Sequence, residues 1–499
     1  MTGSAYDALH ARFNRLGTIE EALAILSWDY ATMMPKGGAN ARGEQMSVLQ
    51  VIAHQQLTAP DLEDLFGRAA MEGGRDVWAE ANLAAMNRQW RKAIAVPADL
   101  VAALAKATLE CEMIWRQARP DNDYPAVRPA LSELLNLTLQ AGQAKADAFG
   151  LGLYDALLDD YEPGGRSAHI DTLFAELAGF LPDLINTAIE HQAKEPAPIQ
   201  PQGPFPIVRQ RELADRMMRA LGFDFGHGRL DVSAHPFSGG IPDDVRITTR
   251  YEEGLFSRSL MGVLHETGHA LYEQGLPAAW RRQPVGVARG MSMHESQSLM
   301  VEMQACRSAE FMQFLAPVAR EVFGGEGAAW EPENLHRLET RVRRGLIRVD
   351  ADEVTYPAHV VLRYRLERAI IQGELGLDDL PGAWRDGMKE LVGSVPETDR
   401  EGCLQDIHWY SGSWGYFPTY TLGAMTAAQL FDAAKRAVPS IPGDLAKGDF
   451  SNLLGWLRTH IHGRASSVPG EVIVKEATGA PLGTSVFRQH LERRYLGRT

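Results

Sequence analysis

Hydrophobic positions recur every three or four residues along most of the chain, which is the spacing of amphipathic helices. Residues 6–28 show it clearly, with one apolar stripe from end to end. The same spacing predicts helices over residues 41–54, 77–93, 99–119, 124–149, 169–194, 208–221, 257–274, 333–347, 356–374, 422–437, 450–462 and 486–495. Short loops that often contain proline or glycine separate these segments. The pattern therefore predicts a mostly α fold with a large helical body.

The period changes in one region, directly before the predicted helix 257–274. Residues 229–233 and 245–251 alternate between apolar and polar and are partly β-branched, and a Gly-Gly pair lies between them. Alternation of this kind is typical of strands with one buried face. We therefore predict a small antiparallel β-sheet, with the Gly-Gly region at its turn.

The proline-rich stretch 195–206 is the best candidate for a domain boundary. It separates an N-terminal helical half, residues 1–200, from a catalytic half, residues 201–499. The first half could be a scaffold or a lid over the active site. A chain of 499 residues is long enough for two or three average domains, although large helical enzymes of this length can form one body. We expect the two halves to form one continuous structural unit.

Composition and charge narrow the range of partners. The chain has 50 Lys and Arg against 64 Asp and Glu, a net charge of −14, which disfavours nucleic acid and anionic membrane surfaces. No run approaches the roughly 20 apolar residues of a membrane span, and no secretory signal opens the sequence. Three scattered cysteines are too few for a disulfide framework and suggest a reducing compartment. We therefore expect a cytoplasmic protein that acts on a small molecule or a peptide.

The predicted helix 257–274 carries the motif His265-Glu266-Thr267-Gly268-His269. Residues four apart share one helix face, so the two histidines can bind one metal ion while Glu266 stands beside them as a base. The alternative is a pair of solvated surface histidines. However, the flanking apolar residues place this helix in a core, where ionisable side chains are usually paired or bound to metal. The motif therefore predicts a zinc site.

A third ligand is needed, because a catalytic zinc usually has three protein ligands and leaves a fourth position to water. Glu295 is the main candidate. It opens the next helical run, and a return helix would bring its carboxylate back to the metal. His294, the preceding residue, is the alternative.

Six motifs occur in a characteristic order: His235-Pro236-Phe237, Asp244-Val245-Arg246-Ile247-Thr248, the metal motif, His294-Glu295-Ser296-Gln297, Ile347-Arg348-Val349-Asp350-Ala351-Asp352, and Gly402-Cys403-Leu404-Gln405-Asp406-Ile407-His408-Trp409. In this order they resemble the carboxypeptidase Taq family, the thermostable carboxypeptidases first known from Thermus. The resemblance covers nearly the whole chain, from Leu26-Ser27-Trp28-Asp29 to Thr421-Leu422-Gly423. Residues 298–303 depart from the Trp- and Asn-containing continuation of the family.

The resemblance implies a helical fold with a deep active-site cleft, a zinc or cobalt ion, a homodimer, and release of single residues from the C-terminus of peptides. It implies His265, His269 and Glu295 as metal ligands and Glu266 as the catalytic acid and base. The implied function is that of a metallocarboxypeptidase. A zinc oligoendopeptidase of similar helical shape is the alternative, and an inactive metal- or peptide-binding protein fits an intact Glu266 less well.

A carboxypeptidase needs a cation for the terminal carboxylate of its substrate. Arg348 is the leading candidate and Arg246 the second, because a guanidinium can bind a carboxylate through two hydrogen bonds. Either arginine could instead pair with a nearby aspartate, such as Asp350, Asp352 or Asp244.

Other candidates for substrate binding lie in the aromatic and polar segments 402–409 and 415–420. Tyr420 or His408 could donate a hydrogen bond to the oxyanion of the reaction, although either could be a structural residue. His235 and Gln405, which lie in two of the motifs, complete the predicted substrate-binding set. Asp350, Asp352 and Asp406 could orient the metal ligands.

Overall fold

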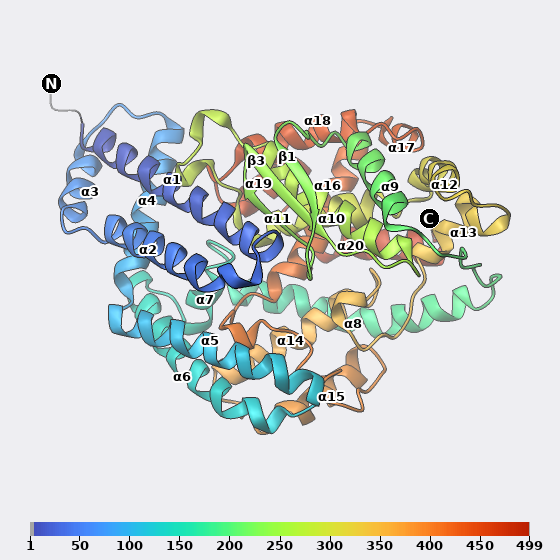
Figure 1. Ribbon diagram of the computed structural model, residues 1–499, viewed down its shortest axis with the longest axis horizontal. Coiled ribbons are helices and arrows are strands. Elements are labelled where there is room, and N and C mark those ends of the chain that lie inside the picture. The colour runs from blue at the N-terminus through green and yellow to red at the C-terminus, as the bar shows by residue number, and fades with distance from the viewer. Residues whose placement is uncertain (1–3, 499) are drawn as a thin grey trace.

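The computed structural model describes residues 4–498, and it is mostly helical, as predicted. The helices of the first half are α1 (Ala5–Thr32), α2 (Ala39–Leu57), α3 (Leu62–Met71), α4 (Val77–Ala95), α5 (Ala98–Asp121), α6 (Tyr124–Phe149), α7 (Leu153–Leu158) and α8 (Ser167–Gln192). After α9 (Ile207–Ala220) come the strands β1 (Gly228–Val232), β2 (Phe237–Ile241) and β3 (Asp244–Thr249). Figure 1 shows this sheet beside α1 and the central helices.

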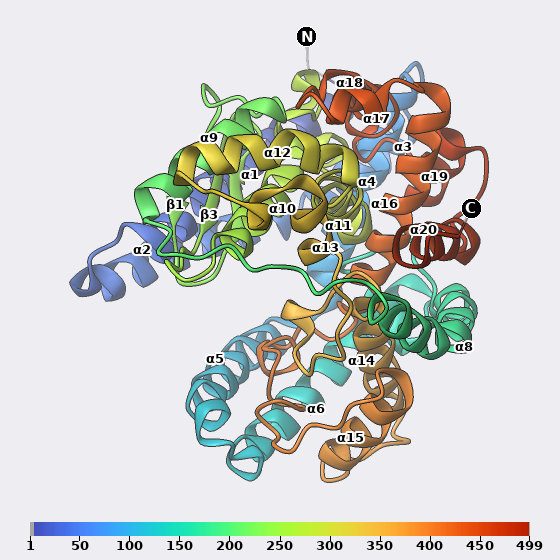
Figure 2. The same cartoon turned by 90° about the vertical axis from the view of Figure 1, so that its right-hand side faces the viewer.

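The sheet is followed by α10 (Phe256–Gln274), by α11 (Gly290–Leu299) and by a π-helical segment, Met300–Ala305. The remaining helices are α12 (Ala309–Phe323), α13 (Pro332–Glu339), α14 (Tyr356–Ile371), α15 (Leu380–Leu391), α16 (Pro418–Ala437), α17 (Ile441–Leu445), α18 (Ser451–His460), α19 (Gly470–Thr478) and α20 (Thr484–Leu496). In Figure 2, α14 and α15 lie with α5 and α6, far from α12 and α18. Both α14 and α15 contact α8, so segments from the two halves of the sequence pack together.

The buried apolar side chains form two clusters. The smaller one joins α1, α3 and α4 through residues such as Leu9, Phe13, Phe66 and Met86. The larger one extends from Cys111 to the C-terminal helix and includes α10, which carries the metal motif. The predicted boundary near residue 200 stays a prediction. No helix within residues 4–498 has both the length and the apolar character needed to cross a bilayer.

Residues with a preference for helix ends cap several of these helices. Ser4 and Asp7 form a capping box at the start of α1, in which each side chain accepts a hydrogen bond from the other residue's backbone. Asp123 caps the start of α6, and Gly150 ends that helix with a φ of 65°. These are local signals, which explains why the start of α1 and both ends of α6 match the predicted ranges closely, whereas α1 continues to Thr32, beyond the predicted end at residue 28.

The sheet is mixed, so the prediction of a wholly antiparallel sheet is wrong in part. Its strand order is β1-β3-β2, with β1 parallel and β2 antiparallel to β3. The Gly-Gly pair does not form the turn but lies inside β2. Gly240 has a φ of 86°, and a Cβ there would come within 2.2 Å of Asp244 O. The glycine therefore allows a close strand pairing that the alternating pattern does not reveal.

The predicted helix 333–347 ends early, since α13 stops at Glu339. Gln192, at the end of α8, binds the chain directly beyond this point: its amide donates to Thr340 O at 2.9 Å and its Oε1 accepts from Val342 N at 3.0 Å. Because these bonds replace those of a further helical turn, the segment leaves the helix despite its apolar spacing.

Candidate metal centre

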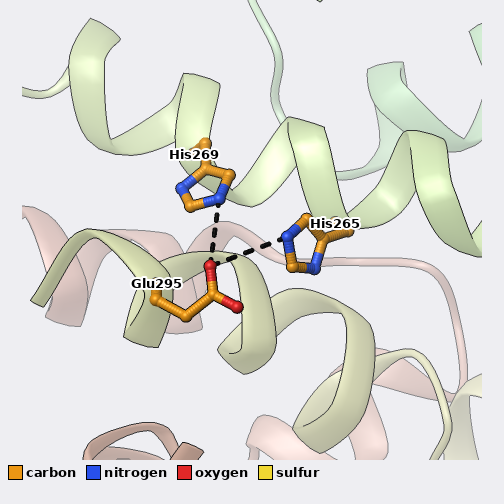
Figure 3. A group of neighbouring side chains, drawn as sticks. All are labelled: His265, His269 and Glu295. Carbon is orange, nitrogen blue, oxygen red and sulfur yellow. Dashed lines mark ion pairs between the residues drawn. The ribbon is translucent and has the colours of Figure 1, made fainter. Parts of the chain in front are cut away.

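His265, His269 and Glu295 lie together, as predicted for metal ligands. One potential ligand atom from each residue falls within 4.8 Å of the other two. Figure 3 shows both rings on one face of α10, with the carboxylate of Glu295 on α11 opposite them. Glu295 Oε2 lies 3.8 Å from His265 Nε2 and 3.4 Å from His269 Nε2. Two ligand atoms of a tetrahedral zinc are about 3.4 Å apart, so these residues fit such an ion.

Two glycines allow the helices to approach closely enough for this arrangement. A Cβ on Gly268, within the metal motif, would come within 2.4 Å of Gln297 O on α11. A Cβ on Gly423 of α16 would come within 2.8 Å of the Glu295 side chain. Any larger residue at either position would push apart the helices that bring the ligands together.

His265 has a carboxylate partner on its other ring nitrogen that the sequence analysis did not identify. His265 Nδ1 lies 2.9 Å from Glu302 Oε2, and Arg307 Nη2 donates to Glu302 Oε1 at 2.8 Å. Such contacts fix the tautomer and orientation of a ligand histidine. The sequence did contain a signal for this partner. Glu302 follows Glu295 by seven residues, and residues at this spacing share one helix face. It lies in the segment that departs from the family pattern.

His294 lies behind His269 and not in the ligand group. The Nδ1 atoms of the two rings are 2.6 Å apart, and His294 Nε2 lies 2.8 Å from Glu273 Oε1. One set of tautomers satisfies these nitrogens: His269 donates to His294, and His294 donates to Glu273. This arrangement leaves His269 Nε2 directed at Glu295. His294 therefore supports a predicted ligand, which favours Glu295 over His294 as the third.

The carboxylates of the centre favour a positive charge at His265, whereas burial lowers the pKa of His269 to about 4. Burial lowers the pKa of His265, but Glu295 and Glu302 raise it to about 10. Burial would raise the pKa of Glu295, whereas His265 and His269 lower it to about 2. A metal cation supplies the same positive charge to such a donor set. Burial raises the pKa of the neighbouring Glu266 to about 7, a value suited to proton transfer near neutral pH.

Arg348 lies in a second group, in which Asp406 binds two arginines. Its Nε and Nη2 donate to Asp406 Oδ1 at 3.0 and 2.7 Å, and Arg363 Nε donates to Asp406 Oδ2 at 2.6 Å. Gln405 accepts from the backbone of Arg348 at 2.9 Å and donates to two other carbonyls. Arg348 Nη1 has no hydrogen bond within residues 4–498. One edge of this guanidinium is therefore held and the other is left for a further acceptor.

Tyr420 joins this group to the metal centre. It lies on the first turn of α16, three residues before Gly423, so it shares the helix face that packs on Glu295. The Arg348 guanidinium lies 4.7 Å from the Tyr420 ring centroid, and Tyr420 Oη lies 2.9 Å from His408 Nε2. Burial raises the pKa of Tyr420 to about 12 and lowers that of His408 to about 3. The phenol therefore keeps its proton and the imidazole is neutral.

Arg246 and His235 lie elsewhere, at the sheet. Arg246, on β3, donates to Asp244 at 3.0 and 2.7 Å, and its guanidinium lies 4.1 Å from the Trp28 ring centroid of α1. His235 is exposed just before β2. Within residues 4–498, no hydrogen bond, ion pair or ring contact joins either side chain to the metal centre or to the Arg348 group. A contact of either with substrate stays a prediction.

The three aspartates considered as partners of the metal ligands have other roles in the structure. Asp350 pairs with Arg258 at 2.7 Å. Asp352 accepts from backbone groups at the start of α14, including Thr355 N at 3.0 Å. Asp406 binds arginines, as described above. Within the described part of the chain none of them bonds to the predicted ligands, because Glu302 and His294 occupy those positions.

Glu367 is buried on α14 behind the segment that carries Trp409 and Gly415. It accepts from Tyr154 Oη at 2.7 Å and Trp409 Nε1 at 2.8 Å, and no cation pairs with it within residues 4–498. Burial raises its pKa from 4.5 to about 7. The pKa of Glu367 is therefore higher in the folded protein than in the unfolded chain. Protonated Glu367 contributes its full stabilisation of the fold below pH 4.5, and this contribution is lost as the pH rises to about 7.

We therefore expect the free energy of unfolding of the unmodified protein, minus that of the Glu367→Gln variant, to fall by roughly 3 kcal/mol between pH 4.5 and 7. Urea unfolding at several pH values measures this difference. Glu374→Gln, at an exposed position shortly after α14, serves as the control. The pH dependence of its free energy of unfolding should be the same as that of the unmodified protein. Parallel curves for Glu367→Gln and the unmodified protein would contradict the prediction.

Comparison with known proteins assigns the chain to a family. Residues 8–495 match the model of the family described as carboxypeptidase Taq (M32) metallopeptidase. Thermostable carboxypeptidase 1 of Thermus thermophilus is 40% identical over 485 residues, covering 95% of this chain and 94% of that protein. Thermostable carboxypeptidase 1 of Pyrococcus furiosus is 34% identical over 495 residues, covering 97% of each.

The fold is also similar to that of a solved structure. Trypanosoma cruzi metallocarboxypeptidase 1 superposes with a TM-score of 0.96 at 40% identity, covering 98% of this chain and 99% of that one. These three relatives are carboxypeptidases, which favours this activity over the oligoendopeptidase alternative. The chain therefore belongs to the carboxypeptidase Taq (M32) family of metallopeptidases and is a metal-dependent carboxypeptidase that hydrolyses peptides.

Proposed function

We propose that His265, His269 and Glu295 hold the divalent metal of this carboxypeptidase, and that the ion is zinc, which cobalt can replace. The observation that carries the proposal is the convergence of their three ligand atoms within 4.8 Å. Two nitrogen donors and one carboxylate are a usual ligand set of catalytic zinc. The contacts of Glu302 and His294 behind the two rings support it, because they leave the Nε2 atoms directed at Glu295.

We assign the general base to Glu266. When bound, zinc lowers the pKa of a water molecule and polarises a carbonyl group. Glu266 is adjacent to the ligand His265 in sequence and is buried, with 9% of its surface exposed. Its carboxylate accepts a proton from the attacking water and passes that proton to the departing amine. Amide hydrolysis needs both transfers because the amine is a poor leaving group until it is protonated.

Tyr420 is our candidate for the donor to the oxyanion. When His408 Nε2 carries the ring proton, it donates to Tyr420 Oη and leaves the phenol hydrogen free for a substrate oxygen. Its pKa of about 12 keeps that hydrogen in place at neutral pH. His408 thus acts through Tyr420 and need not touch the substrate.

We propose that Arg348 binds the free C-terminal carboxylate of the peptide. Asp406 and Gln405 hold it in place, Tyr420 lies against it, and its Nη1 has no acceptor within residues 4–498. Arg246 is the second candidate. A cation at one end of the site positions the last peptide bond over the reacting groups, which is what distinguishes removal of single C-terminal residues from internal cleavage.

A C-terminally amidated peptide should therefore be cleaved much more slowly than its free-acid twin. The lost charge-assisted hydrogen bond is worth about 1.5–3 kcal/mol, or roughly ten- to hundredfold in kcat/KM. Arg348→Ala should remove most of this preference, whereas acetylation of the N-terminus should matter little. Mass spectrometry of a digest time course measures both peptides in one reaction.

The preference is the ratio of the cleavage rates of the free-acid and the amidated peptide by one enzyme variant. Partial loss of folded enzyme lowers both rates equally and does not change this ratio. Arg250→Ala, at an exposed position next to β3, is the matched control and should keep the preference. If Arg246→Ala and not Arg348→Ala removes it, the two roles are exchanged. Internal fragments from amidated and free peptides alike would contradict the proposed direction of attack.

We further propose that the enzyme works in the cytoplasm as a homodimer on peptides with a free C-terminus, and not on nucleic acid or at membranes. The net charge of −14 supports the exclusion of polyanions. The few cysteines support a reducing compartment. The family resemblance supports the dimer. Location and dimer both stay predictions.

A further inference from the structure

The π-helical segment Met300–Ala305 connects the helix of one predicted ligand to the partner of another. It continues α11, which carries Glu295, and it contains Glu302, which contacts His265. Cys306 N donates to Val301 O at 2.8 Å, a bond across five residues in place of the usual four. Such turns are rare and costly in an α-helix, and they are frequent at functional sites. Some other part of the molecule must therefore stabilise this one.

The C-terminal helix α20 supplies a contact to the backbone of this segment. The guanidinium of Arg494 donates to two consecutive carbonyls, Met303 O and Gln304 O, the second at 2.8 Å. Its side chain is 9% exposed. Figure 2 shows α20 beside α16 and α8, against which it packs. Two donors in the rigid plane of one guanidinium fix the relative orientation of two neighbouring peptide groups.

A buried carboxylate completes this contact. Glu353, just before α14, accepts from Gln304 Nε2 at 2.7 Å and from Arg494 Nη1 at 3.0 Å. It also accepts from His490 Nε2 at 2.8 Å and Tyr495 Oη at 2.9 Å, both on α20. Its exposed fraction is 5%. Because an unpaired buried charge is strongly unfavourable, this carboxylate holds Gln304 and α20 in one arrangement.

We propose that Arg494 and Glu353 are positioning residues for the metal ligand His265. They hold the π-helical turn so that Glu302 reaches His265 Nδ1, although neither touches the metal centre itself. The connection runs from α20 through the backbone at residues 303 and 304 to Glu302, and from there to the imidazole. This proposal rests on the assignment of His265 as a ligand made above.

The test uses cobalt-loaded enzyme, because the visible spectrum of cobalt reports the geometry of its ligands. In Arg494→Gln we expect a shifted spectrum and release of cobalt to a chelator about 10- to 100-fold faster, as when a partner of a ligand is lost. Arg494→Lys keeps the charge and should recover part of the effect. The matched control is Arg493→Gln, at the adjacent exposed position, which should behave like the unmodified enzyme.

Circular dichroism and the melting temperature identify variants that fail to fold. Glu353→Gln is the second variant and should shift the spectrum in the same direction. A folded Arg494→Gln or Glu353→Gln with an unchanged spectrum and unchanged cobalt release would overturn the proposal. His265→Ala separates the two assignments: if it loses cobalt while those variants keep it normally, the ligand assignment holds and the positioning role fails.

Discussion

Replacing Glu266 by glutamine is expected to lower kcat by about two to four orders of magnitude, the usual loss when a general base is removed. Glutamine keeps the size and shape of the side chain but cannot accept the proton of the attacking water. The metal content should stay near one ion per chain, because the three proposed ligands are intact. Metal analysis and steady-state kinetics on one preparation measure both quantities.

A matched control is available in the loop before α10. Glu253→Gln makes the same chemical change at an exposed position and should leave kcat and metal content unchanged. Loss of metal in Glu266→Gln would mean that Glu266 is a ligand. A kcat close to that of the unmodified enzyme would place the base elsewhere.

His269→Ala should remove the bound metal and, with it, all measurable activity. Two remaining ligands do not hold a divalent ion at ordinary concentrations, and the chemistry depends on that ion. Stripping the unmodified enzyme with a chelator should have the same effect, and zinc or cobalt should restore its activity. Neither metal should restore the variant at the concentration that restores the unmodified enzyme.

His294→Ala distinguishes a ligand from the residue behind it. His294 contacts His269 at its Nδ1 atom and not at Nε2, so its loss should weaken metal binding by about 10- to 100-fold without abolishing it. Equilibrium dialysis against zinc measures the affinity of the His294→Ala and His269→Ala variants for the metal. His169→Ala, at an exposed position on α8, is the control. Full metal occupancy in His269→Ala, or complete loss in His294→Ala with normal binding in His269→Ala, would reverse the assignment.

Helices were predictable where their signal is local. The apolar spacing over residues 257–274 agrees within one residue with α10, because the 3.6-residue period of a helix is repeated along the segment itself. Several helices outside the predicted ranges were missed, among them α3, α12, α15 and α19, although each of them buries one apolar face. Where a distant side chain takes the backbone hydrogen bonds, as Gln192 does beyond Glu339, the local pattern predicts too long a helix.

Strand pairing was less predictable, because it joins segments that the alternating pattern describes only one at a time. Residues near 229–233 and 245–251 do form strands, but they are parallel neighbours. The antiparallel partner of β3 is the Gly-Gly segment. A missing Cβ at Gly240 makes this pairing possible, and such an effect depends on how closely two backbones approach.

What the sequence by itself determined is the local chemistry. The four-residue spacing of His265 and His269 puts both on one helix face whatever surrounds them, and the order of the motifs identifies the family. Tertiary structure alone decided the partners: Glu302 and His294 behind the ligands, Asp406 on Arg348, and Arg494 on the π-helical turn. The physical reason is that helix geometry fixes distances over four residues, whereas a contact across 190 residues depends on how whole helices pack.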